Sequence, residues 1–86
     1  MMPLTLGERV LLWRKRRKLT QKQLAARISL NPISLSKIER GVVQDLEAST
    51  VRKLAQALSV KTDYLLGLIG EEEAEAHYHL ALSETE

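Results

Sequence analysis

Apolar residues recur along this chain at spacings of three and four, the pattern of one buried face of an α-helix. Leu6, Val10 and Trp13, followed by Arg17, mark such a face on a first helix, which we expect over residues 6–18. Val, Ile and Thr do not alternate with polar residues as they would in half-buried strands. The pattern predicts an all-α chain.

Two helix start signals follow the first stripe. Thr20 and Gln23 have the spacing of a capping box, in which the threonine hydroxyl accepts from the backbone N–H of Gln23 and the glutamine side chain reaches back. Asn31 followed by Pro32 combines an N-cap side chain with a proline at the first helical position, where its missing N–H costs nothing. We expect a helix to begin at each of these positions.

Apolar residues predict two further helices. Val51, Leu54 and Leu58 share one face of the fourth helix, and Leu65 and Leu66 are the apolar residues of a short fifth helix. The predicted helices cover residues 6–18, 20–28, 31–40, 47–58 and 61–68. Five helices in so short a chain predict a compact bundle.

The second and third predicted helices are joined through a short turn, Ser29-Leu30-Asn31. A turn this short makes two helices cross steeply, as in the helix-turn-helix. Counted from Gln21 as the first of twenty positions, that motif needs apolar residues at the fourth, eighth, tenth, fifteenth and eighteenth positions and a small residue at the fifth. The residues found there are Leu24, Ile28, Leu30, Leu35, Ile38 and Ala25.

Several fragments in the right order then carry a family resemblance. They are Leu6-Gly7-Glu8-Arg9-Val10, Leu19-Thr20-Gln21, Gln23-Leu24-Ala25, Ile38-Glu39-Arg40-Gly41 and Lys61-Thr62-Asp63-Tyr64-Leu65-Leu66-Gly67. The chain resembles the Cro and lambda-repressor-like family, also called the XRE family. The resemblance implies a five-helix DNA-binding domain at 6–68. The acidic tail at 69–86 is expected to be helical or disordered, and because an isolated helix of this length would be unstable, a helical tail would have to dock on the body.

The resemblance also implies roles for individual residues. The helix at 31–40 would lie in the major groove of DNA. The residues expected to face the duplex are Asn31, Pro32, Ile33, Ser36, Lys37 and Arg40. Contacts with the DNA backbone are expected from Gln21, Lys22, Arg14 and Lys15. Arg14 is further expected to pair with Glu39 and so tie the first helix to the third.

Two features, one in the turn and one in the first helix, depart from the family pattern. Ser29 stands where the turn favours a left-handed glycine, at a cost of about 1 kcal/mol. Leu11 and Leu12 stand where relatives have charged or polar residues. We expect these adjacent leucines to point outward and to mark a partner surface.

The start of the recognition helix is a third departure. Pro32 and Ile33 cannot form bidentate hydrogen bonds with a base, although an apolar group can pack on the methyl group of thymine. Direct readout is then expected from Lys37, Asn31 and Ser36.

Charge is divided sharply along the chain. Residues 1–70 hold all 13 Lys and Arg against 5 acids, a net charge of +8, whereas residues 71–86 hold 6 acids and no Lys or Arg, a net charge of −6. A basic body favours a polyanionic partner such as DNA.

The sequence has no feature that indicates catalysis or membrane insertion. The chain has no Cys and no glycine-rich phosphate loop, and the pair His77 and His79 has no accompanying ligand cluster. We therefore expect no enzyme activity, no cofactor and no metal. No run of about 18 apolar residues occurs, so we expect a cytoplasmic protein without membrane contact.

A single recognition helix reads only a few base pairs, so we expect a homodimer on an operator with two half-sites. Residues 61–68 with the tail are the candidate interface. The expected function is a transcriptional regulator, as a repressor. The alternative is an antitoxin or a protein-bridging adaptor with the same fold, whose partner would bind the tail or the pair Leu11 and Leu12.

Overall fold

The computed structural model describes residues 3–76. This part of the chain forms five α-helices and one short 3₁₀ helix: α1 (Leu6–Arg16), α2 (Gln21–Arg27), α3 (Pro32–Glu39), α4 (Ala48–Leu58), α5 (Thr62–Leu65) and η1 (Glu71–Glu73). The all-α, five-helix prediction is confirmed. The pair His77 and His79 lies outside the described residues.

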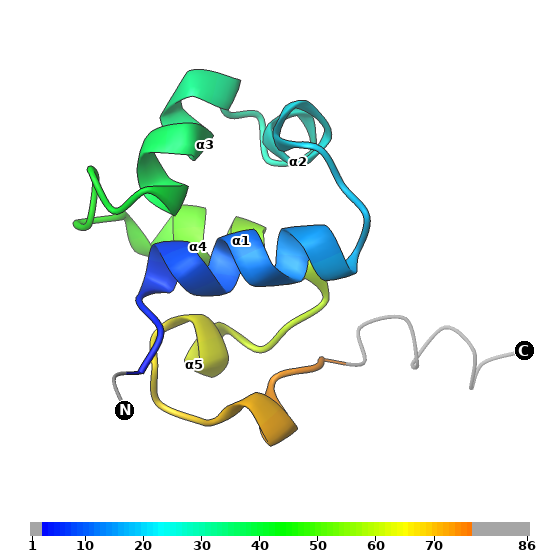
Figure 1. Cartoon of the computed structure of the whole chain (residues 1–86), viewed down its shortest axis with the longest axis vertical. Helices are drawn as coiled ribbons and strands as arrows, with labels where there is room; N and C mark the ends of the chain where they lie inside the picture. Colours follow the sequence, from blue (N-terminus) through cyan, green and yellow to red (C-terminus); the bar gives the residue numbers. More distant parts are fainter. Residues whose placement is uncertain (1–2, 77–86) are drawn as a thin grey trace, which may run out of the picture.

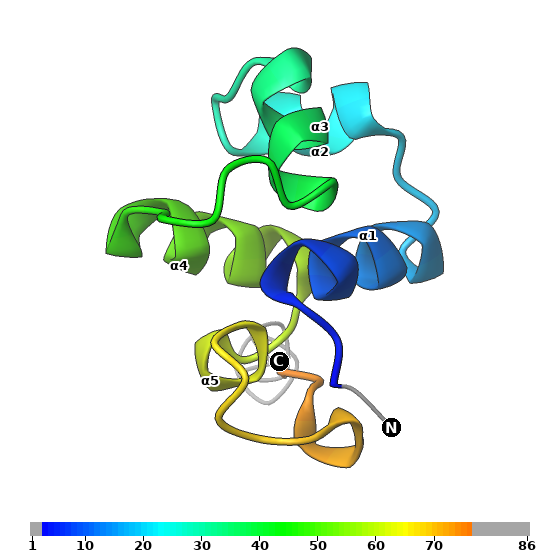
Figure 2. The same cartoon turned by 60° about the vertical axis from the view of Figure 1, so that its left-hand side comes forward.

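The helices are stacked in three levels. α2 and α3 occupy one end of the molecule, α1 and α4 cross the middle, and α5 and η1 lie at the other end (Figures 1 and 2). α1 contacts α3, α4 and α5, so it is the central element. The buried core is formed by Val10, Trp13, Leu24, Ala25, Ile28, Leu35, Val51, Leu54, Ala55, Leu58, Val60, Tyr64, Leu65 and Ala74.

The predicted helix starts are present. Thr20 Oγ1 accepts from the backbone N–H of Gln23 at 3.0 Å, and the Gln23 side chain accepts from the backbone N–H of Thr20 at 2.9 Å. Asn31 caps α3, with Pro32 in its first turn. A further capping box, between Thr5 and Glu8, starts α1.

Two helices end two or three residues earlier than predicted. α1 stops at Arg16 because the chain turns at Lys18, which has a left-handed φ of 59°. α5 stops at Leu65 because Gly67, with φ of 81°, redirects the chain. Both differences arise from backbone turns that apolar periodicity does not reveal.

Gly7 allows α1 to approach the end of α3 closely. A Cβ atom at this position would lie 2.2 Å from the backbone carbonyl oxygen of Ile38 and 2.9 Å from that of Glu39. These oxygens belong to the backbone and cannot swing away as a side chain would. The absence of a side chain at Gly7 therefore sets the distance between the two helices.

The described part of the acidic tail is docked on the body. Ala74 is buried, its carbonyl accepts from the backbone N–H of Lys61 at 2.8 Å, and the N–H of Ala76 donates to Ser59 at 2.9 Å. Residues 71–76 thus form a 3₁₀ turn and an extended stretch that pack on the body, in place of the α-helix that is one of the expectations for the tail. The physical reason is that Ala74 enters the core and the flanking backbone pairs with residues 59–61.

Leu12 corrects another expectation. Its side chain packs against the core, and Leu11 is half-buried, so the two do not form an exposed pair. Large apolar side chains are exposed at Leu4, Ile33, Val42, Val43, Leu66 and Leu68. Within residues 3–76, no helix is long and apolar enough to cross a membrane.

Candidate nucleic-acid interface

The turn between α2 and α3 has the expected left-handed residue. Ser29 has φ of 55°, and the N–H of Leu30 donates to the carbonyl of Ala25 at 2.8 Å. Leu24, Ala25 and Ile28 of the first part of the motif are buried. The two helices therefore pack through the positions that the motif predicts.

α3 presents one stripe of side chains away from the core. Ile33, Ser36, Lys37 and Arg40 are spaced by three and four residues, so they share a helical face. Ile33 is 66% exposed, Lys37 and Arg40 are exposed, and Ser36 is half-buried. We call these four residues the α3 stripe.

The side chains of Asn31 and Ser36 each accept a hydrogen bond within the protein. The Oδ1 of Asn31 accepts from the backbone N–H of Ile33 at 2.7 Å as the helix cap. The Oγ of Ser36 accepts from the Nε of Arg40 at 3.3 Å, which directs the arginine along the helix. Pro32 is exposed beside the cap.

A buried ion pair holds α3 to α1. The Nε of Arg14 lies 2.7 Å from Oε2 of Glu39, and the two side chains are only 11% and 3% exposed. Arg14 Nη2 donates to Glu39 Oε1 at 3.1 Å and Nη1 donates to the carbonyl of Leu19 at 2.9 Å. Gln21 Nε2 donates to Glu39 Oε1 at 2.9 Å, so α2 joins the same network. Full pairing offsets the desolvation of the buried charges.

The residues expected to contact the DNA backbone fall into two groups. Arg14 and Gln21 direct their side-chain donors to protein groups, as described above, and serve the scaffold. Lys15 and Lys22 are exposed. The contacts of these four residues with DNA remain predictions.

The basic run at the end of α1 also contains two structural arginines that the sequence reasoning did not assign. Arg17 donates to the carbonyls of Leu58 at 2.7 Å and Ser59 at 3.1 Å, which satisfies the end of α4, and its Nη2 lies 3.3 Å from Glu75. Arg16 pairs with Glu71 at 3.1 Å. The partners lie more than 40 residues away in sequence, so no local signal identified them.

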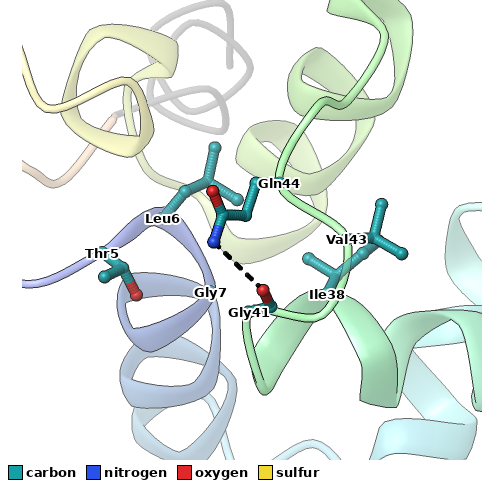
Figure 3. Close-up of a pocket in the computed structure, with 7 residues that line it drawn as sticks. All are labelled: Thr5, Leu6, Gly7, Ile38, Gly41, Val43 and Gln44. Atoms are coloured by element: carbon teal, nitrogen blue, oxygen red, sulfur yellow. Dashed lines mark hydrogen bonds between the residues drawn. The ribbon is translucent and has the colours of Figure 1, made fainter.

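A pocket of about 200 Å³ lies beside the C-terminal end of α3, between the start of α1 and the loop to α4 (Figure 3). It is lined by Thr5, Leu6, Gly7, Ile38, Gly41, Val43 and Gln44. Gln44 Nε2 donates to the Gly41 carbonyl at 3.3 Å along one side. The lining does not include the α3 stripe, so the pocket and the candidate interface are separate features.

α2 and α3 are two short helices that cross at a left-handed turn, and the second of them exposes the α3 stripe. The buried pair of Arg14 and Glu39 fixes α3 to α1. These observations define a helix-turn-helix domain of the DNA-binding type. The chain belongs to the helix-turn-helix domain family, whose model matches residues 7–71.

Comparison with an individual protein agrees with this family assignment. An immunity repressor protein of Bacillus phage phi105 is 40% identical over an alignment of 75 residues that covers 84% of this chain and 51% of the relative. The chain therefore spans about half the length of this curated relative.

Solved structures show the same fold. The P22 c2 repressor, crystallised in complex with a synthetic operator, is 27% identical with a TM-score of 0.71, covering 78% of this chain and 100% of that one. The N-terminal DNA-binding domain of SinR from Bacillus subtilis is 25% identical with a TM-score of 0.69, covering 79% of this chain and 96% of that one. The resemblance to the Cro and lambda-repressor-like family is confirmed.

Proposed function

We propose that this protein binds an operator in double-stranded DNA sequence-specifically and represses transcription as a homodimer. The observation that carries the proposal is the α3 stripe, in which Lys37 and Arg40 are exposed. The opposite side of α3 is fixed to α1 by the ion pair between Glu39 and Arg14. A rigid helix with an exposed cationic face suits insertion into the major groove. The function is binding rather than catalysis, and it takes place in the cytoplasm with the DNA.

The relatives support this function. The P22 c2 repressor was crystallised with operator DNA, and the phage phi105 relative is named an immunity repressor. The shared fold and the matching helix-turn-helix positions carry the analogy to this chain. The net charge of +8 over residues 1–70, from 13 Lys and Arg against 5 acids, supplies attraction to phosphate.

We assign the DNA contacts by position. Residues of the α3 stripe, with Asn31 and Pro32 at its start, face the base edges. Lys15 and Lys22 neutralise phosphates from the preceding helices. Arg14 and Gln21 act on DNA mainly by holding α3 in place, because their side chains are bound to Glu39.

We place the dimer interface at the end of the molecule that carries α5. Leu66 is 52% exposed and Leu68 is 70% exposed, although both are large apolar residues. Burial of such side chains in an interface stabilises association. This pair replaces Leu11 and Leu12 as the candidate partner surface.

The test is selection of binding sites from a randomised duplex pool by the purified protein at physiological salt, followed by sequencing. Enrichment of an inverted repeat is the expected result. Lys37→Ala should weaken the enriched site by about tenfold or more relative to random DNA. The matched control is Lys53→Ala, an exposed lysine of α4, which should leave that ratio unchanged. Absence of any enriched sequence would contradict the proposal.

A further inference from the structure

A groove of about 560 Å³ lies at the end of the molecule that carries α5, whereas α3 lies at the other end (Figures 1 and 2). Its apolar wall is formed by Pro3, Leu4, Leu68 and Ile69. Leu4 is 38% exposed and Leu68 is 70% exposed, so much of this wall is open to solvent. A mostly apolar hollow of this size, with few polar groups, has the dimensions of a small-molecule site.

Arg9 is the cation that lines this groove among the described residues. Its guanidinium carbon lies 5.7 Å from the centroid of the Tyr64 ring, and a Cβ atom on Gly67 would lie 3.3 Å from its Nη2. These contacts hold the half-buried side chain against α5. Within residues 3–76, however, the guanidinium has no hydrogen bond and no ion pair. Its N–H groups are therefore available to an anion in the groove.

The carboxylate that lines the groove does not supply this anion. Oε1 of Glu71 accepts from Arg16 at 3.1 Å, and its Oε2 accepts from the hydroxyl of Tyr64. Both oxygens are thus engaged, and Arg16 balances the negative charge. Glu72 is exposed at the rim, where its Oε1 would lie 3.1 Å from a Cβ atom on Gly70. Glu72 is the group that opposes the entry of an anion.

We propose that this groove binds a small organic carboxylate with an apolar body, of the kind of a medium-chain fatty acid. The carboxylate pairs with the guanidinium of Arg9 through two parallel N–H···O bonds. The hydrocarbon chain lies along Leu4 and Leu68 and removes their apolar surface from water. Charge complementarity selects this ligand, because one cation in an otherwise apolar wall matches one anion at the end of an apolar molecule.

Calorimetric titration of the full chain with octanoate tests the inference. Octanoate should bind at one site, whereas octylammonium, which has the same chain and the opposite charge, should not bind. Hexanoate is two methylene groups shorter and should bind about three- to fifteenfold more weakly, since a fully buried methylene contributes about fourfold to affinity. Absence of octanoate binding would overturn the inference, and so would octylammonium binding as tight as that of octanoate.

Charge variants assign the site. Arg9→Met removes the cation and should weaken octanoate binding by about tenfold or more. Arg27→Met, a matched change of an exposed arginine on α2, should bind octanoate as the wild type does. Glu72→Gln removes the opposing charge and should bind more tightly. Circular dichroism shows that each variant is folded. Wild-type affinity in a folded Arg9→Met variant would contradict the role of Arg9.

Leu68→Ser tests the apolar wall without disturbing the contacts of Arg9 with α5. Leu68 is 70% exposed, so its replacement leaves the core intact. This variant should bind octanoate about threefold or more weakly. Ile33→Ser, on α3, changes a residue that is 66% exposed and should leave the affinity unchanged. If neither Leu68→Ser nor Arg9→Met weakens octanoate binding, the ligand binds elsewhere and the inference is wrong.

The groove shares Leu68 with the proposed dimer surface, and the outcomes separate the two. If octanoate does not bind and self-association is lost in Leu68→Ser, the groove belongs to a second copy of the chain and the inference falls. If octanoate binds while no DNA sequence is selected, the proposed function fails and the carboxylate site stands.

Discussion

Glu39 shows at the level of single residues how this domain tolerates a buried charge. Its carboxylate accepts two hydrogen bonds from Arg14 and one from Gln21, so three helices meet at one side chain. A buried carboxylate without these donors would keep its desolvation cost and lose the compensating attraction. Removal of one donor should therefore destabilise the domain by more than the whole network contributes to its stability, because the Glu39 carboxylate would stay buried without its partner.

Arg14→Ala should lower the free energy of unfolding by about 3–5 kcal/mol, because Glu39 is then buried without its cation. Urea denaturation measures the change. Arg16→Ala is the control: its pair with Glu71 is exposed, with side-chain exposures of 48% and 42%, and surface pairs of this kind contribute about 0–1 kcal/mol. Similar losses for the two variants would contradict the buried-network interpretation.

Tyr64 has a phenol whose ionisation opposes folding. Burial raises its pKa to about 12, and its hydroxyl donates to Glu71, which favours the neutral form further. Because the folded pKa lies above the usual value of about 10, the unfolded chain ionises first. The contribution of Tyr64 to stability should thus be constant below about pH 10 and be lost as the pH rises toward 12.

Denaturation series at increasing pH measure this dependence, and an ultraviolet titration of the phenolate locates the pKa itself. Tyr64→Phe assigns the signal, because the chain has only one other tyrosine. A phenolate titration of Tyr64 near pH 10 would contradict the burial argument.

At the scale of elements, the contact between α1 and α3 depends on Gly7. Gly7→Ala should destabilise the domain by about 1–3 kcal/mol, since the new Cβ overlaps the backbone of α3 and the helices must separate. Thermal and urea unfolding both report the loss. Gly70→Ala is the matched control, because its nearest neighbour is the flexible side chain of Glu72 at 3.1 Å. Equal stability of the Gly7→Ala variant and the wild type would refute the close approach.

The turn between α2 and α3 carries a cost that a substitution should recover. Ser29 holds a left-handed φ of 55°, a conformation that glycine adopts without strain. Ser29→Gly should raise the free energy of unfolding by up to about 1 kcal/mol. Ser34→Gly, inside α3, should instead lower it by about 0.5–1 kcal/mol, because glycine weakens a helix interior. A destabilised Ser29→Gly variant would show that the serine side chain contributes to the turn.

At the scale of the whole molecule, residues 71–76 complete the fold. They bury Ala74, place Glu71 against Tyr64 and Arg16, and pair Val60 with Glu75 across an antiparallel bridge. A boundary at residue 68 would cut these contacts, and the family match itself ends at residue 71, before Ala74 and Glu75.

A chain ending at residue 70 should be less stable than one ending at residue 76 by about 2–4 kcal/mol, since several hydrogen bonds and a buried side chain are lost. Comparison of their urea midpoints tests this, with circular dichroism confirming that both remain helical. Identical midpoints would mean that the docked segment contributes nothing to stability.

Much of the fold could be predicted from local sequence. Capping boxes, the proline at the start of α3 and the apolar positions of the motif act within a few residues, so their residue types and spacings report the structure directly. The pair of Arg14 and Glu39 was predicted only from the family resemblance. Its members lie 25 residues apart, so no local sequence signal connects them.

The sequence by itself determined that the chain is helical, where most of its helices begin, and that α2 and α3 form a helix-turn-helix with an outward stripe. Tertiary structure alone decided that Leu12 packs against the core, that Arg17 binds the carbonyls at the end of α4, and that residues 71–76 dock on the body as a 3₁₀ turn and an extended stretch. Helix signals depend on neighbours within one or two turns, whereas these choices depend on surfaces that meet only when distant segments pack.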